Sequence, residues 1–324
     1  MGSQLRATPS AYEPDEVEPL VTAAIMYYQA QRSQEQIARH LKVSRPTVSR
    51  LLARARQLGI VRIEIVPPSI DPSLAKDLAE KLQMRAVHIA AGVADPNDPA
   101  PVLTGRLNDA LAEIGLQAGD VIVVGWGRAI YSLARADLMS QPGVVVVPAL
   151  GGSDEDRPWF QSNEIARRWA VTLEGAPRYL HAPALVAPAL KRSLVGDEAI
   201  QSTLRLWDGA TAAIVGMGAY PKLDRSLVAT GFLAGGPEIA GAVGDVVGRF
   251  FAEDGTPIHY ADERRLLAIL PERLRQIPYV IGIAVGTDKA RAIIGAARAG
   301  FINTLVTDTV TARSVAGLLG EVKN

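Results

Sequence analysis

Several residues in the C-terminal part of the chain have side chains that could move protons. Asp245, Glu253, Asp254 and His259 lie close together in the sequence, and carboxylates and imidazoles are common general acids and bases. The same groups can also hold a polyhydroxylated ligand through hydrogen bonds alone. These residue types therefore leave both a catalytic site and a binding site open.

Thiol and metal chemistry are not expected. The chain has no cysteine, which removes thiolate nucleophiles, thiolate metal ligands and disulfides. Its histidines, at positions 40, 88, 181 and 259, show neither His-x-x-His nor His-Glu-x-x-His spacing. His181 ends a predicted strand, where it could reach a pocket or serve only as a structural hydrogen-bonding group. We therefore expect no metal site.

Four loops place glycine and polar residues after predicted strands. They are Gly125-Trp126-Gly127-Arg128, Gly151-Gly152-Ser153, Gly216-Met217-Gly218 and Gly286-Thr287-Asp288-Lys289. Glycine lets a backbone approach a ligand, and the start of a helix favours anions. Each loop alone could serve only the geometry of a strand-to-helix turn. Together they predict a pocket for a small phosphorylated or polyhydroxylated ligand.

No nucleotide cofactor is expected at these loops. A dinucleotide fingerprint needs a third glycine, but Gly125-x-Gly127 is followed by Ile130 and Gly216-x-Gly218 by Pro221. The sequence also lacks a G-x-x-x-x-G-K-[ST] loop. We therefore exclude a nicotinamide-dependent dehydrogenase, find no support for nucleotide hydrolysis and expect no cofactor.

The segments that carry the loops alternate between strand and helix patterns. Apolar runs predict strands over residues 86–90, 121–125, 144–150, 178–181, 212–215, 280–285 and 303–306. Such runs indicate strands buried on both faces, and their alternation with helices is typical of a parallel α/β sheet. We predict an α/β fold with a Rossmann-like, mostly parallel sheet flanked by helices. Its ligand should lie beyond the carboxyl ends of the strands.

The N-terminal part has a strongly uneven charge. The whole chain balances 34 basic against 34 acidic residues, yet residues 31–62 contain eight basic residues and one acidic residue, Glu35. The basic positions are Arg32, Arg39, Lys42, Arg45, Arg50, Arg54, Arg56 and Arg62. A local basic stripe of this kind is what phosphate neutralisation requires.

Helical periodicity predicts three helices in and before this stripe. The first covers about residues 17–30, and its predicted buried face is Val17, Leu20, Val21, Ala24, Ile25 and Tyr28. The second begins at Ser33, where Ser33-Gln34-Glu35-Gln36 forms a capping box. The third begins at Ser44, and Pro46 is tolerated in its first turn.

Only Lys42-Val43 separates the second and third helices, which is typical of a helix-turn-helix that reads the major groove. An amphipathic helical pair with a solvated basic face is the alternative. The caps, the tight turn and a short wing strand predicted over residues 60–66 favour DNA binding. The residues expected to contact double-stranded DNA are Ser33, Gln34, Ser44, Arg45, Pro46, Thr47, Ser49, Arg50 and Arg54.

These features predict an N-terminal winged helix-turn-helix followed by a larger domain. We divide the chain into a disordered tail (residues 1–15), a DNA-binding domain (16–68) and an effector-binding and oligomerisation domain (69–324). A further helix, over residues 71–82, could pack on the large domain or form a dimer contact. The N-terminus lacks the apolar region of a signal peptide, and the apolar runs are too short to span a bilayer. We expect a cytoplasmic protein without a membrane partner.

Longer motifs resemble the SorC family of bacterial sugar-responsive transcriptional regulators. In the N-terminal part they are Ser33-Gln34-Glu35-Gln36-Ile37-Ala38 and Ser44-Arg45-Pro46-Thr47-Val48-Ser49-Arg50-Leu51-Leu52. In the large domain they include Val124-Gly125-Trp126-Gly127-Arg128, Ser162-Asn163-Glu164, Gly241-Ala242-Val243-Gly244-Asp245 and Leu305-Val306-Thr307-Asp308. The likeness covers nearly all of residues 17–320.

The resemblance implies a sugar, sugar-phosphate or polyol effector, a tetramer built as a dimer of dimers, and a fold related to phosphosugar isomerases. It implies that Lys289 holds a phosphate or another anionic group and that Asp245 bonds sugar hydroxyls. The effector residues expected from the loops and the resemblance are Gly125, Gly127, Arg128, Gly152, Ser153, Asn163, Gly216, Met217, Asp245, Phe250 and Lys289.

The sequence departs from the family at two places. Ala129 follows the Trp-Gly-Arg run where the family often has threonine, so one hydroxyl that could bond a phosphate is missing. The stretch Asp156-Arg157-Pro158-Trp159-Phe160 is unusual, and its aromatic residues could stack on an effector or belong to the core.

Together these features predict a regulator of a carbohydrate catabolic operon, not an enzyme. Its operator binding would be controlled by the effector. The alternative is a phosphosugar isomerase or deaminase with a fused DNA-binding module, which would turn its ligand over.

Overall fold

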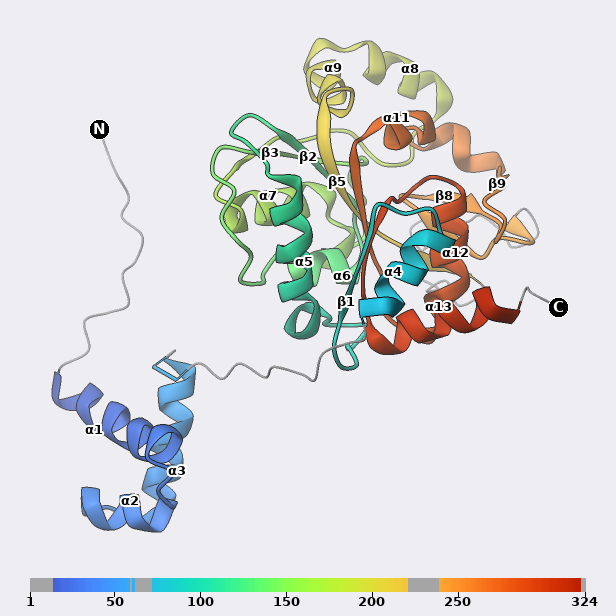
Figure 1. Cartoon of the computed structure of the whole chain (residues 1–324). Coiled ribbons are helices and arrows are strands. Elements are labelled where there is room, and N and C mark those ends of the chain that lie inside the picture. Colours follow the sequence, from blue (N-terminus) through green and yellow to red (C-terminus); the bar gives the residue numbers. More distant parts are fainter. Residues whose placement is uncertain (1–13, 59, 62–71, 221–238, 322–324) are drawn as a thin grey trace, which may run out of the picture. The chain divides into compact units, whose positions relative to one another are not determined.

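A computed structural model of the protein describes residues 14–58, 60–61, 72–220 and 239–321 (Figure 1). The chain forms two compact units, Met1–Val66 and Pro67–Asn324. The division falls close to the boundary that we predict after Pro68. The predicted tail, except for the first residues of α1, and the link between the units lie outside the described residues.

The small unit is helical. It contains α1 (Pro14–Ala24), the π-helical segment η1 (Ile25–Gln29), α2 (Gln34–Leu41) and α3 (Arg45–Gln57). The predicted capping box is present, because the Ser33 hydroxyl accepts from the Gln36 amide and the Gln36 side chain accepts from the Ser33 amide. Ser44 caps α3 by accepting from the Thr47 amide at 3.3 Å. Both helix starts are therefore fixed by local sequence.

The turn between α2 and α3 brings their apolar faces together. Lys42 ends α2 in the left-handed conformation, with φ of 54°, which reverses the chain within a few residues. A buried cluster then forms from Ala23, Ile37, Ala38, Val48 and Leu52. This small core holds α3 against α1 and α2.

The predicted buried face of the first helix is partly wrong. Leu20 and Ala24 are buried as expected, but Ile25 and Tyr28 are 48% and 37% exposed. Ile25 lies five residues after Leu20, so its side chain points about 140° away from the buried stripe. The predicted wing lies mostly outside the described residues; Ile60 and Val61 pack against a cluster of Leu20, Ala24 and Ala55.

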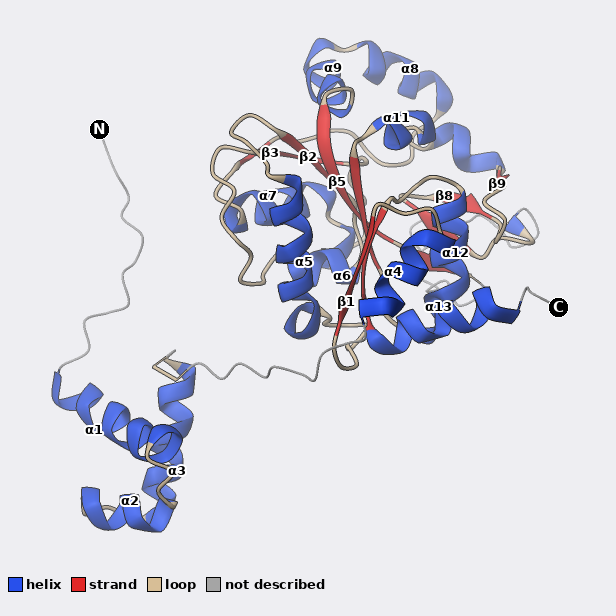
Figure 2. Ribbon diagram, viewed as in Figure 1, coloured by secondary structure: helices blue, strands red, loops and turns tan. Residues whose placement is uncertain are grey.

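The large unit is built on a seven-stranded parallel sheet with the order β1-β11-β10-β5-β2-β3-β4 (Figure 2). The strands are β1 (Ala86–Ala90), β2 (Val121–Val124), β3 (Val145–Pro148), β4 (Ala176–Pro177), β5 (Ala210–Gly216), β10 (Tyr279–Ile283) and β11 (Thr304–Asp308). Every residue of β2 and β11 is buried, so both faces of the sheet are covered. The predicted α/β class and parallel sheet are confirmed.

Helices and short 3₁₀ turns connect the strands. The helices are α4 (Pro72–Lys81), α5 (Ala100–Ile114), α6 (Arg128–Leu133), α7 (Ser162–Thr172), α8 (Pro188–Gly196), α9 (Glu198–Leu204), α11 (Pro271–Gln276), α12 (Ala290–Arg298) and α13 (Thr309–Glu321). The 3₁₀ turns are η2 (Pro158–Phe160), η3 (Arg205–Trp207), η5 (Ala261–Arg265) and η6 (Thr287–Lys289). Helix α4, predicted over residues 71–82, packs against β1 and α13 through the buried Leu78.

One predicted strand, over residues 178–181, is wrong. Strand β4 is Ala176–Pro177 and ends before this stretch. The side chain of Asn163 accepts from the Leu180 amide at 2.9 Å and donates to the Leu180 carbonyl at 3.2 Å. Because a side chain satisfies these main-chain groups, they are not paired with a neighbouring strand.

A second sheet was not predicted. It is antiparallel, with the order β6-β7-β8-β9, and consists of β6 (Gly218–Ala219), β7 (Gly244–Val246), β8 (Arg249–Phe251) and β9 (Pro257–Ile258). These strands are too short to show an alternating pattern. Gly244 is required here, since a Cβ atom would lie 2.5 Å from the Gly218 carbonyl oxygen and 2.6 Å from the Ala292 side chain. Val247 and Gly248, both with positive φ, form the turn between β7 and β8.

The capping box makes a prediction for the small unit. Replacing Ser33 with alanine removes the acceptor for the Gln36 amide and should cost about 1 kcal/mol of helix stability. Native-state hydrogen exchange of the α2 amides should therefore speed up. The exposed Ser49, in the middle of α3, is the matched control, because Ser49→Ala removes no cap. Equal acceleration of the α2 amides in both variants would contradict the capping role.

Candidate functional site

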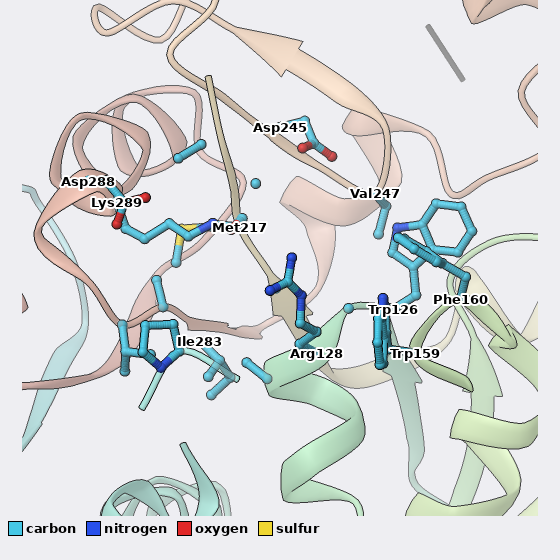
Figure 3. A pocket seen from close by; sticks show the side chains of 18 residues that line it. Trp126, Arg128, Trp159, Phe160, Met217, Asp245, Val247, Ile283, Asp288 and Lys289 are labelled. Carbon is cyan, nitrogen blue, oxygen red and sulfur yellow. Dashed lines mark hydrogen bonds between the residues drawn. The ribbon is translucent and has the colours of Figure 1, made fainter. Parts of the chain in front are cut away.

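A cavity of about 370 Å³ lies at the carboxyl ends of β2, β5 and β10 (Figure 3). Three loops that follow these strands supply much of its wall, through Trp126-Gly127-Arg128, Gly216-Met217-Gly218 and Asp288-Lys289. Parallel pairing of β5 with both β2 and β10 places these loops at one edge of the sheet. Asp245 from β7, together with Val247 after it, reaches the same cavity from the second sheet.

Two oppositely charged groups in the wall are shielded from solvent, Asp245 fully and Lys289 in part. Asp245 is buried, and its carboxylate accepts from the Gly248 amide at 3.0 Å. Burial raises the pKa of Asp245, while the Gly248 hydrogen bond and the charge of Lys289 act in the opposite direction. Burial also lowers the pKa of Lys289, against the attraction of Asp288 and Asp245.

Hydrogen bonds hold the two cationic side chains of the wall. Lys289 Nζ donates to the Met217 carbonyl at 2.9 Å, which joins η6 to the segment that follows β5. Arg128 Nη1 donates to the Asn97 side chain at 2.8 Å. The site therefore presents ordered cations and a buried carboxyl group, which suits a ligand with several oxygen atoms.

Aromatic side chains form another part of the wall. Trp126 and Phe160 meet edge to face, with ring centroids 5.1 Å apart. Trp159 lies 6.4 Å from Phe160, and the Arg128 guanidinium lies 5.8 Å from the Trp159 ring. Figure 3 shows this aromatic group on the opposite side of Arg128 from Lys289 and Met217. The cavity therefore has one aromatic side and one charged side.

The structure brings together about half of the effector residues that the sequence predicts. Those that line the cavity are Gly127, Arg128, Gly216, Met217, Asp245 and Lys289. Trp159 and Phe160, which the sequence left open between ligand stacking and core packing, also line it. Val247, Asp288 and Pro96 are lining residues that the sequence did not single out as site residues. Of these, Asp288 could have been found, since it stands beside Lys289 in the last of the four loops.

Five predicted effector residues lie outside this lining: Gly125, Gly152, Ser153, Asn163 and Phe250. Gly152 donates its amide to the Ala182 carbonyl, and the Ser153 hydroxyl accepts from the Glu155 amide. The Asn163 amide is used by the Leu180 main chain, and the buried Phe250 packs on Tyr260. Gly125 donates to Ile214 within the sheet. The contacts of these five residues are therefore with other parts of the protein, and they do not line the cavity.

The acid–base candidates are not gathered at the cavity, where only Asp245 lies among its lining. Glu253 pairs with Arg291, Asp254 accepts from the Thr256 amide, and His259 contacts Glu263 at 2.6 Å. His181 is exposed, and its nearest ring contact is Tyr179. Within the described part of the chain, no three His, Asp or Glu side chains form a group that could hold a metal ion.

The small unit presents a separate basic surface. Arg45, Pro46, Ser49, Arg50 and Arg54 are all exposed on α3. Pro46, Arg50 and Arg54 lie on the side away from the buried Val48 and Leu52. Arg50 Nη2 lies 3.5 Å from the Thr47 hydroxyl, within hydrogen-bond distance. The other predicted contact residues are Ser33 and Ser44, which cap α2 and α3, and the half-buried Gln34 and Thr47.

Comparison with known proteins identifies the class. Residues 66–316 match the family described as "Putative sugar-binding domain", and residues 22–64 match a helix-turn-helix domain family. The chain is 31% identical over 308 residues to a deoxyribonucleoside regulator of Bacillus subtilis, covering 91% of this chain and 96% of that protein. It is 29% identical over 306 residues to a sorbitol operon regulator of Klebsiella pneumoniae, covering 92% and 97%.

A solved structure gives the same result. The full-length sorbitol operon regulator SorC from Klebsiella pneumoniae superposes with a TM-score of 0.73 at 30% identity, over 94% of this chain and 99% of that chain. The fold and these matches define a transcriptional regulator with a sugar-binding domain. The chain belongs to the SorC family. Its named relatives are regulators and not enzymes, which confirms the regulator interpretation over the isomerase alternative.

Among the described helices, none is long and apolar enough to cross a bilayer.

The buried carboxyl group makes a prediction about stability. Asp245→Asn removes the charge that burial disfavours but keeps an oxygen for the Gly248 amide. At pH 7 the variant should unfold a few degrees above wild type, as measured by calorimetry. Because its pKa is raised in the folded state, ionised Asp245 destabilises the folded protein at pH values above the unfolded pKa of about 3.9. The difference in melting temperature between the variant and wild type should therefore narrow as the pH falls towards about 4.

The control for this experiment is Asp254→Asn. The exposed Asp254 accepts from the Thr256 amide, which lowers the pKa of its carboxyl group. Loss of that charge should therefore destabilise the protein at pH 7. A lower melting temperature for Asp245→Asn at pH 7 would contradict the burial argument.

Proposed function

We propose that this protein binds an operator through α3 and that a carbohydrate bound in the cavity of the large unit controls this binding. The observation that carries the proposal is the combination, in one chain, of an exposed basic helix-turn-helix surface and a cavity lined by Asp245, Arg128 and Lys289. A deoxyribonucleoside regulator and a sorbitol operon regulator among its relatives support a carbohydrate catabolic operon as its target. It would act in the cytoplasm, where operator DNA is found.

The effector is a sugar, a sugar phosphate or a polyol in this proposal. Lys289 and Arg128 would hold an anionic group or hydroxyl oxygens, and Asp245 would accept from hydroxyl groups. Gly127, Gly216 and Met217 line the cavity beside these groups. Residues 16–68 would form the DNA-binding domain and residues 69–324 the effector and oligomerisation domain.

The protein would act as a homo-oligomer, a tetramer in the proposal. Helix-turn-helix domains read two half-sites at a spacing that the oligomer fixes. Apolar side chains are exposed in both units: Ile25, Tyr27 and Tyr28 in the small one, and Leu190 and Val195 on α8, which has no buried residue. An effector that prefers one arrangement of the oligomer would shift the population by its differential affinity, and operator affinity would change with it.

The recognition helix is tested by substitution. Arg50→Ala and Arg45→Ala should each weaken binding to the specific operator by about 1–3 kcal/mol, because a bidentate arginine–guanine contact has about that value. The operator is first selected from random duplexes with wild-type protein, and affinities are then measured by fluorescence anisotropy. Arg106→Ala, which changes an exposed arginine on α5, is the control. Unchanged specific affinity in both α3 variants would rule out this helix as the reader.

The effector site is tested by a thermal-shift screen with sugars, sugar phosphates and polyols, because a bound ligand raises the melting temperature by mass action. Lys289→Ala should weaken binding of any compound that stabilises wild type by about tenfold or more, since a charged hydrogen bond contributes about 1.5–3 kcal/mol. Operator affinity without effector should stay unchanged.

Lys76→Ala, which alters an exposed lysine on α4, is the control and should respond as wild type does. If none of the compounds stabilised the wild-type protein, the sugar-sensing part of the proposal would be wrong. A normal response of Lys289→Ala would remove only this residue from the site.

A further inference from the structure

Trp159 is the least expected part of the cavity wall. It lies in η2, in the stretch where the sequence departs from the family, and it lines the cavity while remaining half-buried. Part of the ring is therefore open to a ligand. In Figure 3 it stands on the aromatic side, across from Lys289.

The position of this residue is fixed from several directions. Its carbonyl oxygen accepts from the Gly127 amide at 2.9 Å, which joins η2 to the loop that starts α6. The Arg128 guanidinium lies 5.8 Å from its ring, and Phe160, with a ring centroid 6.4 Å away, packs in turn on Trp126. A ring held in this way offers a surface that needs little reorganisation when a ligand binds.

The indole nitrogen of Trp159 differs from those of two other tryptophans. Trp169 Nε1 donates to the Ile130 carbonyl and Trp207 Nε1 to the Pro148 carbonyl, each at 3.0 Å. Trp159 Nε1 is equally hidden from solvent, yet it has no acceptor in the part of the chain that the structure describes. Buried donors in folded proteins nearly always have a partner. An oxygen atom of a ligand in the adjoining cavity would supply one.

From these observations we propose that Trp159 determines which carbohydrate the cavity accepts, and that this carbohydrate is bound as a closed ring. The inference rests on the proposed function and narrows it. A closed sugar ring presents a flat face of C–H groups, whose partial positive charge matches the negative face of an indole. An open-chain polyol lacks such a face.

In this arrangement the effector lies between the two sides of the cavity. One face of its ring covers Trp159, and its oxygen atoms reach Asp245 and Lys289 on the charged side. Trp159 Nε1 is hidden from solvent without a ligand, so the atoms around it must move aside before a ring oxygen or hydroxyl can accept from it. Trp159 therefore acts on specificity, while the charged side supplies the hydrogen bonds that any hydroxylated ligand can use.

The test uses matched pairs of closed-ring and open-chain compounds on the full chain: D-glucose with D-sorbitol, D-ribose with D-ribitol, and the phosphate esters of each. Affinities are measured by isothermal titration calorimetry. The closed-ring member should bind wild type about tenfold more tightly than its partner. Trp159→Phe keeps an aromatic ring and removes the N–H. This variant should bind the closed-ring compound about tenfold more weakly than wild type does, which corresponds to the loss of about one hydrogen bond. Trp159→Ala loses both and should bind about a hundredfold more weakly.

Trp207→Phe is the control, because it removes a tryptophan whose N–H has a protein partner. It should lower the melting temperature and leave ligand affinity unchanged. Equal affinity of wild type, Trp159→Phe and Trp159→Ala for a compound that binds would overturn the inference and leave the proposed function standing. So would tighter binding of the open-chain compounds. Failure of every compound to bind wild type would overturn the proposed function and this inference with it.

Discussion

The cavity depends on one constraint, the parallel pairing of β5 with β2 and β10. Parallel strands end at the same edge of a sheet, so loops far apart in the sequence meet there without further adjustment. For this reason Trp126, Met217 and Lys289 line the same cavity. The buried, apolar strands fix this edge firmly, because a shift of register would expose core residues.

Burial at this edge shifts the pKa values of two charged side chains. Asp245 and Lys289 are each disfavoured by burial, and each is stabilised by the charge of the other. Inside a protein such groups interact more strongly than in water, and a ligand that hydrogen-bonds to them replaces solvent that they have lost. A binding site therefore follows from this arrangement. Of the acid–base candidates that the sequence offers, Glu253, Asp254 and His259 have partners elsewhere and do not line the cavity.

The two units follow different structural logic. The small unit has a small hydrophobic core. The starts of α2 and α3 and the turn between them are set by residues close together in the sequence. Its basic residues remain on the outside of α3, where DNA can reach them. The large unit has an extensive core and holds its polar groups in a fixed cavity. A sensor benefits from such rigidity, because a preorganised site loses little free energy on ordering.

The sequence by itself determined what depends on neighbouring residues. The capping box at Ser33, the start of α3 at Ser44 and the apolar strands follow from short-range patterns, because capping and alternation act over a few positions. Motif resemblance added the family, and with it the roles expected of Asp245 and Lys289. The loops at Gly127 and Gly216 were found because each follows a strand that the sequence shows clearly.

Only the tertiary structure decided which of the candidates share a cavity. Gly152 and Asn163 have the right residue types, but their hydrogen bonds go to Ala182 and Leu180, partners that no local pattern reveals. The second sheet was hidden because its strands are two or three residues long and are defined by pairing alone. The sequence left open whether Trp159 belongs to the hydrophobic core or to the binding site. Its place in the wall, and the lack of an acceptor for its N–H among the described residues, depend on packing between segments distant in the chain.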